Sequence, residues 1–306
     1  MSPAGLPSTF FTAPPEWGWW IVLYFFVGGI AGGAYVLAVL IDLVGRPEAR
    51  GLARLGYVVA FPAVVVSALL LIVDLHRPER FWHMLVQSET WRPMFKAWSP
   101  ISFGAWALLA FGAFALVGVL AALHEDGRLR WGWLSRLRPP APLGIVLGVL
   151  GGALGLVVAG YTGVLLAVTN RPIWADSPLL GLLFLVSGAS TAAAVLILLA
   201  TRARRWAADV ETLARFDAFA LALELVVLVA LVASLGSIVP RVWFNAWGLL
   251  LLVGVGILGI LVPLALEWHP RAPAPSRALA AALVLVGGLL LRVVMLLSAE
   301  AVGRVA

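Results

Sequence analysis

The sequence contains no cysteine among its 306 residues. Without a thiolate, no disulfide, cysteine-ligated zinc site or iron–sulfur cluster can form within this protein. Charged residues are also scarce, at 12% of the total, whereas hydrophobic residues make up 62%. A soluble domain of this length needs a much larger charged surface, so the composition indicates an integral membrane protein.

The few charges are unevenly distributed in sign, with a formal net charge of +6. In a soluble protein this excess would suggest nucleic-acid binding. Here the arginines sit in short loops between apolar runs, which is typical of anchoring at a membrane surface. We therefore expect a lipid bilayer as the partner of this basic surface, and no nucleic acid.

Apolar runs of about 18 residues or more are long enough to cross a hydrocarbon core of about 30 Å. The sequence contains eight such runs, at residues 17–44, 56–73, 101–123, 143–168, 179–200, 214–239, 242–266 and 278–297. No segment between them is long enough to fold as a soluble domain. The sequence thus predicts an all-α integral membrane protein, a single domain over residues 1–306, with eight transmembrane helices arranged as two four-helix bundles.

The distribution of Lys and Arg over the loops predicts the orientation. The loops after the first, third, fifth and seventh spans carry more basic residues than the other loops and tails together. By the positive-inside rule these loops are cytoplasmic, so we expect a multi-pass protein of the cell (inner) membrane with both termini outside. The loop after the second span, with four basic residues, departs from the rule.

Four polar residues fall in the outer half of the predicted membrane. Tyr24 lies near the outer end of the first span, Asp74 ends the second, Tyr161 lies near the outer end of the fourth, and Arg292 lies in the second half of the last. Inserting an ionisable side chain at the centre of a membrane costs roughly 2.5–3.5 kcal/mol on insertion scales, so such residues are usually functional. This convergence predicts one polar pocket near the outer face.

Three acidic residues occur elsewhere in the spans. We expect Asp42 and Asp217 to be solvated, because they lie near cytoplasmic span ends, whereas Glu224 lies near the middle of its span. Asp217 and Glu224 are seven residues apart and share a helical face. They form either the start of a cytoplasmic proton path or a helix-packing pair bonded to neighbouring spans.

The loop that begins at Asp74 places a carboxylate, an imidazole and a guanidinium within four residues, because His76 and Arg77 follow. One interpretation is an interfacial anchor whose arginines meet lipid phosphates. The pattern favours the other interpretation, a structured surface for a ligand headgroup or a docked partner.

Histidine placement argues against haem. A membrane cytochrome b needs paired His inside its spans as axial ligands. The four histidines are all in loops or at span ends, at His76, His83, His124 and His269. We therefore expect no haem and no metal site in this protein.

Several segments resemble the family of NrfD and the polysulfide reductase membrane subunit, which usually has eight spans. They occur in the family's order and are Tyr24-Phe-Phe-Val-Gly-Gly-Ile-Ala-Gly-Gly33 with Tyr35, Asp74-Leu-His-Arg-Pro-Glu-Arg-Phe-Trp82, Ser99-Pro100-Ile-Ser-Phe-Gly104, Gly160-Tyr161-Thr-Gly163, Asn170-Arg-Pro-Ile-Trp174 and Gly287-Gly288-Leu-Leu-Leu-Arg292. The glycines of the first segment have two interpretations: close helix packing, which is favoured, and a smooth groove for an isoprenoid tail.

The resemblance implies a subunit that binds menaquinone or ubiquinone near the outer face and holds no redox cofactor. It also implies two partners on that face: a four-cluster iron–sulfur subunit, and a catalytic subunit, typically a molybdenum protein. The family's quinone-site residues carry over to Asp74 and Tyr161, and a polar residue of the first span falls near Tyr24. The family's Gly-Gln after its last arginine is absent, because Ala299-Glu300 occupies that region.

These residues supply the chemical groups that quinone exchange requires. Exchange between quinone and quinol moves two electrons and two protons, and it needs hydrogen-bond donors and a titratable group with a path to water. Tyr161 can donate to a carbonyl oxygen, Asp74 can relay a proton, and His76 or Arg77 can tune that carboxyl. The predicted catalytic residues are Asp74 and Tyr161, and the predicted quinone-binding residues add Tyr24, His76, Arg77 and Arg292.

Two other functions are compatible with eight apolar spans. A secondary transporter binds its substrate near the midplane, where only Glu224 clearly lies. A passive membrane anchor would hold a partner complex without quinone chemistry. Binding of a quinone-site inhibitor separates the favoured function from both.

Overall fold

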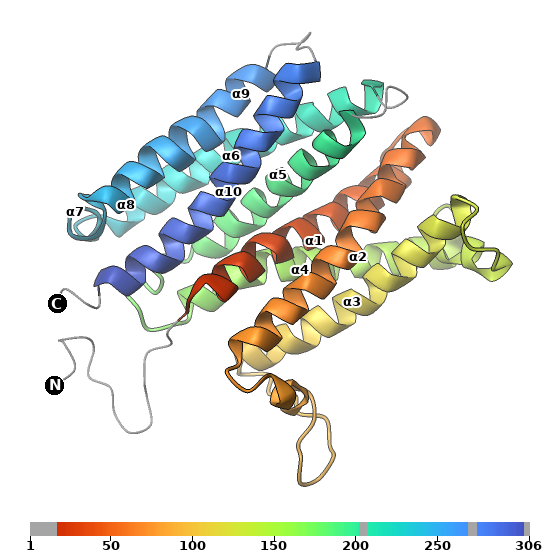
Figure 1. Cartoon of the computed structure of the whole chain (residues 1–306), viewed down its shortest axis with the longest axis horizontal. Coiled ribbons are helices and arrows are strands. Elements are labelled where there is room, and N and C mark those ends of the chain that lie inside the picture. Colours follow the sequence, from red (N-terminus) through yellow and green to blue (C-terminus); the bar gives the residue numbers. More distant parts are fainter. Residues whose placement is uncertain (1–16, 202–206, 269–273, 303–306) are drawn as a thin grey trace.

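A computed structural model describes residues 17–201, 207–268 and 274–302. Within these ranges the protein is helical and forms no strand, and the only β-type pairing is an isolated bridge between Val86 and Pro93. The helices are α1 (Trp19–Val44), η1 (Pro47–Ala49), α2 (Arg50–Asp74), η2 (Pro78–Met84), α3 (Pro100–Glu125), η3 (Gly132–Leu137), α4 (Pro142–Ala167), α5 (Leu180–Thr201), α6 (Ala207–Leu235), α7 (Ile238–Trp243), α8 (Ala246–Leu249), η5 (Leu250–Leu261), α9 (Val262–Glu267) and α10 (Ala274–Val302). Eight spans built from these segments are long and apolar enough to cross a membrane, which confirms the predicted all-α membrane fold (Figure 1).

The ends of the spans follow local sequence signals. Both α3 and α4 begin with a proline, which lacks the N–H that a first helical residue leaves unpaired. The hydroxyl of Ser99 caps α3 by accepting a hydrogen bond from the backbone N–H of Ser102, at 3.3 Å. These signals set where the helices start, whereas hydropathy alone predicts only that a span is present.

The sixth and seventh spans are shorter than predicted at their common connection. Helix α6 ends at Leu235, and Gly236 follows with a positive φ of 50°, a conformation that glycine adopts without strain. The short helix α7 comes next, and the seventh span then begins at α8, where the Asn245 side chain accepts a hydrogen bond from the N–H of Trp247 at 2.8 Å. That span continues through η5, a π-helix, into α9.

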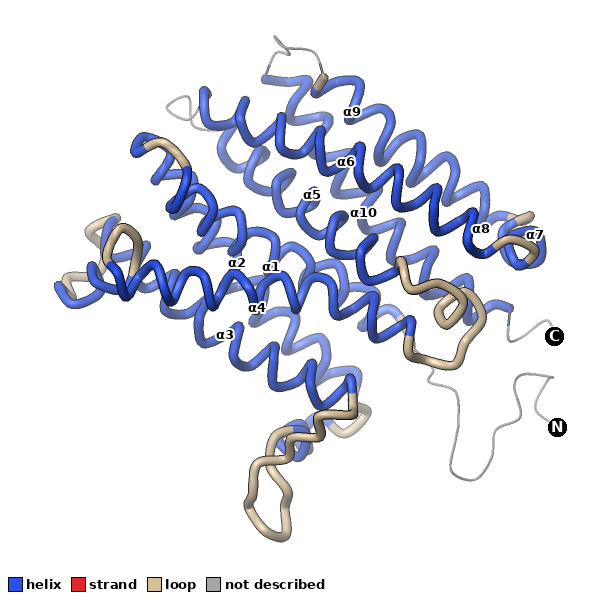
Figure 2. The backbone as a smooth tube through the Cα atoms, turned by 180° about the vertical axis from the view of Figure 1, so that it is seen from behind, coloured by secondary structure: helices blue, strands red, loops and turns tan. Residues whose placement is uncertain are grey.

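Helix α1 lies at the centre of the molecule, packed against α2, α4 and α5 (Figures 1 and 2). Its glycines meet other backbones directly: a Cβ at Gly33 would lie 2.6 Å from the carbonyl oxygen of Gly188, and one at Gly32 would overlap Gly155. These contacts fit the packing interpretation of the glycine pairs. Because α1 and α4 both contact α5, the arrangement in two four-helix bundles stays a prediction.

The two ends of the helical array differ. One end carries η3 and the connection between α1 and α2, and it also holds the end of α9 (Figure 1). We call this end the η3 face. The opposite end carries η2 and α7 and includes the start of α1; we call it the η2 face.

Candidate functional site

Two of the predicted site residues, tyrosines from separate spans, lie within electrostatic range of each other near the η2 face. Tyr24 of α1 is 3% exposed, and Tyr161 of α4 is close enough to interact with it electrostatically. Tyr161 is half-buried, and its ring centroid lies 6.3 Å from that of Phe103 in α3. Neither phenol hydroxyl forms a hydrogen bond with another described residue, so two O–H donors remain available at this end of the bundle.

The position of Tyr161 depends on Gly104. The phenol ring of Tyr161 lies directly against this glycine of α3, where a methyl group would overlap the ring carbon atoms and the hydroxyl. Close approach of a bulky ring to a helix backbone requires a residue without a side chain. The packing thereby joins two of the sequence segments that carry the family resemblance, one ending at Gly104 and one containing Tyr161.

Asp74 is the last residue of α2 and is half-buried. It interacts electrostatically with His76, and among the described residues it forms no hydrogen bond or ion pair. His76 and Arg77 are exposed, and His76 has a positive φ of 56°, which turns the backbone away from the end of α2. No hydrogen bond joins Asp74 to Tyr161 among the described residues.

The segment between α2 and α3 protrudes from the η2 face as an ordered loop (Figures 1 and 2). The rings of Trp82 and Trp91 are stacked with centroids 5.6 Å apart, and the bridge between Val86 and Pro93 closes the loop. Trp106 of α3 fastens its base by donating a hydrogen bond to the Met94 carbonyl oxygen at 3.0 Å. Trp91 and Trp98 are 73% and 81% exposed, so this loop presents aromatic surface to solvent or to a partner.

Arg292 is fully buried, and its Nη2 lies against Gly29 of α1, 3.2 Å from where a Cβ would be. Its Nη1 donates hydrogen bonds to the Ser187 hydroxyl at 2.7 Å and to the Gly288 carbonyl oxygen at 2.8 Å. The structure gives it no hydrogen bond to Tyr24, Asp74 or Tyr161. Its charge instead interacts with Glu224 of α6. The structure therefore brings together two of the four residues expected in the outer pocket, Tyr24 and Tyr161, and places Arg292 in a different cluster.

The acidic residues of α6 are both buried. Asp217, expected to be solvated, is 0% exposed, and the Ser190 hydroxyl donates a hydrogen bond to its Oδ1 at 2.5 Å. Glu224 is 3% exposed. The expectation for Asp217 was wrong because α5 packs against α6 on this face and excludes water.

The expectation of a solvated Asp42 was also wrong. Its side chain is 0% exposed, because Arg138 folds over it from the segment after η3 and donates two hydrogen bonds of 2.7 Å, from Nε and Nη2. A third nitrogen of Arg138 meets Glu125 at 2.5 Å. Burial opposes the charge of Arg138, but hydrogen bonding and charge from Asp42, with the charge of Glu125, raise the pKa of its guanidinium above the usual value.

Three buried polar residues near Asp217 and Glu224 were not predicted from the sequence. Ser187 and Ser190 lie within the apolar span α5, and Glu267 ends α9, one residue beyond the predicted seventh span. Two serines three residues apart within a span are a weak signal. A glutamate bordering a span is usually read as a solvated end, and only the packing of α9 against α6 shows that Glu267 is 8% exposed.

The described residues contain no group of three or more His, Asp or Glu side chains that could hold a metal ion. His76, His83 and His124 lie at the ends of helices or in the loops that follow them, and His269 lies outside the described residues.

Comparison with known proteins places nearly the whole sequence in one family. The sequence model of the family described as "Polysulphide reductase, NrfD" matches residues 8–303. "Protein NrfD" of Escherichia coli K12 is 30% identical over 310 aligned residues, which cover 90% of this protein and 92% of that one. "Protein NrfD homolog" of Haemophilus influenzae is 26% identical over 84% of this protein and 85% of its own length.

The name of a third relative identifies it as a subunit of an enzyme complex. It is the C subunit of the polysulfide reductase of Wolinella succinogenes, which is 30% identical over 184 residues, 57% of this protein and 55% of that one. The matched family model spans nearly all of the eight-helix fold, and it includes the segments around Tyr24, Asp74 and Tyr161. The protein therefore belongs to the NrfD (polysulphide reductase) family of multi-pass membrane subunits of reductase complexes.

Proposed function

We propose that this protein is the quinone-reactive membrane subunit of an oxidoreductase complex, with its quinone site at the η2 face. The observation that carries the proposal is the pair of phenols from α1 and α4, Tyr24 and Tyr161, which lie within electrostatic range of each other and whose hydroxyl groups form no hydrogen bond with another described residue. Asp74, at the end of α2 on the same face, supplies the titratable group that quinone chemistry needs.

The reaction at this site is the interconversion of quinone, two electrons and two protons with quinol. Tyr161 donates a hydrogen bond to one carbonyl oxygen of the headgroup and holds the ring in place. Asp74 accepts a proton from the quinol hydroxyl, or returns one to the quinone oxygen, and passes it to water at the exposed η2 loop. His76 lies within electrostatic reach of that carboxyl and tunes it.

The electrons require a partner. The sequence has no cysteine with which to hold an iron–sulfur cluster. We propose that a four-cluster iron–sulfur subunit carries the electrons between the quinone site and a catalytic subunit, typically a molybdenum protein. Its docking surface is the ordered loop between α2 and α3, which presents Trp91 and Trp98 on the same face as the quinone site.

The proposal is tested by titrating the purified protein with a fluorescent quinone-site inhibitor whose emission is quenched on binding. Wild-type protein is expected to bind it saturably. Tyr161→Phe removes one hydrogen bond of about 1 kcal/mol, which weakens binding by a factor of about five.

Tyr35→Phe is the matched control. Tyr35 is a buried tyrosine of the same helix as Tyr24, but its ring packs against Tyr57 and Phe111, so its loss should leave inhibitor affinity unchanged. Absence of saturable binding to folded wild-type protein would contradict the quinone site and favour a transporter or a passive anchor.

A further inference from the structure

A row of buried polar residues runs through the second half of the molecule, away from the phenol pair. It begins at Glu267 at the end of α9, passes Asp217 and Glu224 on α6, and ends at Arg292 on α10. The exposed fractions of these four residues are 8%, 0%, 3% and 0%. Because Asp217 and Glu224 are seven residues apart, the row covers about 10 Å along α6 at the helical rise.

At the Arg292 end of this row, the positive charge of Arg292 is compensated by the negative charge of Glu224. Arg292 and Glu224 have opposite charges and interact, and Arg292 also donates to Ser187, a residue of α5 that interacts with Glu224 as well. A buried charge that has both an opposite charge and hydrogen bonds is stable in an apolar interior. At this end the opposite charges compensate each other, and only Nε of Arg292 has no hydrogen-bond partner among the described residues.

At the other end, the charges and hydrogen-bonding groups of Asp217 and Glu267 are not fully compensated. The two carboxyl groups face each other closely enough to interact electrostatically. Ser190 satisfies one oxygen of Asp217, but Oδ2 of Asp217 and both carboxyl oxygens of Glu267 have no hydrogen-bond partner among the described residues.

Three charged groups lie near this carboxyl pair. Arg277 of α10 interacts with Glu267, and Glu224 interacts with Asp217 as a further like charge. Arg215 of α6 lies close by, but its side chain is 74% exposed and already pairs with Glu211. Two facing carboxylates with one opposing arginine leave an excess negative charge in a buried place, which a bound cation or proton would remove.

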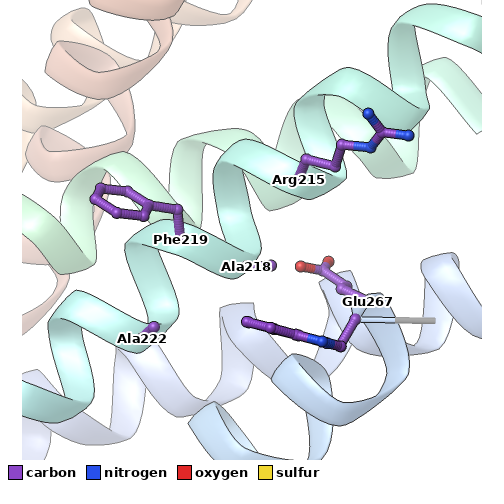
Figure 3. Close-up of a pocket in the computed structure, with 6 residues that line it drawn as sticks. Arg215, Ala218, Phe219, Ala222 and Glu267 are labelled. Carbon is purple, nitrogen blue, oxygen red and sulfur yellow. The ribbon is translucent and has the colours of Figure 1, made fainter. Parts of the chain in front are cut away.

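Glu267, the last residue of α9, borders a pocket of about 460 Å³ between α6 and α9. Its lining includes Arg215, Ala218, Phe219 and Ala222 of α6, and Glu267 with Trp268. Figure 3 shows the Glu267 carboxyl pointing from α9 toward α6, next to Ala218 and within the space bounded by these side chains. The pocket thus connects a buried, unpartnered carboxyl to the surface.

We propose that Asp217 and Glu267 form a proton-exchange site that takes up and releases a proton at the η3 face, the face opposite to the quinone site. One proton shared by the two carboxyl groups removes the excess charge and gives their unpartnered oxygens a donor. Glu224, about two helical turns further along α6, is the next proton acceptor along the row. The site is independent of quinone binding, so it stands or fails separately from the proposed function.

The experiment labels the purified protein with dicyclohexylcarbodiimide, an apolar reagent that adds to protonated carboxyl groups in apolar surroundings and not to ionised, solvated ones. Peptide mass spectrometry then measures the adduct at each acidic residue. We expect at least about tenfold more adduct at Glu267 or Asp217 than at Glu211, a partly exposed glutamate of the same helix α6 that is paired with Arg215.

Infrared spectroscopy provides a second readout that does not depend on access of the reagent. A protonated carboxyl has a carbonyl band that an ionised carboxylate lacks, and this band shifts in D₂O if its proton exchanges with water. The band is expected in wild-type protein, reduced in Glu267→Gln and in Asp217→Asn, and unchanged in Glu211→Gln.

Two results would overturn the proposal. If labelling at the pair does not exceed that at Glu211 and neither variant reduces the exchangeable band, the pair is ionised and serves only helix packing. If sodium chloride suppresses labelling relative to choline chloride at equal ionic strength, sodium competes with the proton for the pair, and the assignment as a site for protons alone fails.

Discussion

Tyr161 owes its position to a residue on a neighbouring helix that has no side chain. Its ring fills the space beside Gly104, whereas Gly112 on the same helix has open space around it. Both glycines lie in the interior of α3, so replacing either with alanine changes helix propensity equally. The pair separates the effect of displacing Tyr161 from any general effect on α3.

We predict that Gly104→Ala displaces the Tyr161 ring and weakens binding of a quinone-site inhibitor by about tenfold, somewhat more than loss of one hydrogen bond, because the ring itself blocks the site. Gly112→Ala should bind the inhibitor like wild-type protein. Titration by fluorescence quenching measures both variants. Equal affinities in the two variants would show that the position of Tyr161 does not matter for binding.

Asp74 ends its helix without a hydrogen bond or ion pair to another described residue, so its carboxyl is available for proton transfer. We predict that Asp74→Asn, which keeps the shape but removes the titratable proton, lowers quinol-dependent turnover of the assembled complex by about 100-fold. Electron transfer between the partner subunits and artificial dyes should be unchanged.

Glu79→Gln, an exposed change within η2, serves as the control and should retain normal turnover. Near-normal quinol turnover in an intact Asp74→Asn complex would rule out Asp74 as the proton relay and move the search to Glu224.

At the scale of helices, the position of a residue along its helix could be predicted from the sequence, but the direction of its side chain could not. That position follows from the rise of about 1.5 Å per residue, which predicts that Tyr24, Tyr161 and Arg292 lie in the same half of the membrane. The rotation of each helix depends on which small residues meet its neighbours, such as Gly33 against Gly188. That rotation turns Arg292 toward Ser187 and leaves the two tyrosines together.

The burial of Asp42 shows the same limit for loops. Hydropathy placed Asp42 at the end of a span, where water is expected. No local signal in the sequence indicates that Arg138, far away in sequence, returns to cover it. Such a contact depends on how the segment after η3 folds back, which is a property of tertiary packing and not of either segment alone.

The buried ion pair between Arg138 and Asp42 leads to a prediction about stability. Arg138→Gln leaves the Asp42 carboxylate buried with Tyr57 as its remaining hydrogen-bond donor. Removing one partner of a buried ion pair typically costs about 3–5 kcal/mol, so the free energy of unfolding in detergent should fall by that amount.

Arg54→Gln is the comparison for Arg138→Gln. Arg54 pairs with Asp126 at 2.9 Å, but both side chains are about one-third exposed, so its loss should cost less than about 1 kcal/mol. A similar loss of stability in both variants would mean that burial of the Arg138 cluster contributes nothing beyond a surface ion pair.

At the scale of the whole molecule, the two faces have opposite roles in the proposals, and their assignment to the two sides of the membrane comes from loop charge alone. The η2 face carries the ordered aromatic loop and has the phenol pair near it, and Glu267 lies where α9 ends at the η3 face. If the loops on the η3 face are cytoplasmic, quinone chemistry occurs near the outer surface and proton uptake near the inner one. The reverse orientation would exchange both.

The absence of native cysteine allows a direct test of this orientation. Ser88, in the protruding loop of the η2 face, and Ser135, in η3, are both exposed serines for which cysteine is nearly isosteric. We predict that an impermeant thiol reagent added to intact cells labels Ser88→Cys and labels Ser135→Cys only after the membrane is opened, because the arginine-rich loops are retained in the cytoplasm. The opposite pattern would place the η2 face in the cytoplasm, where the proposed iron–sulfur partner would then also have to dock.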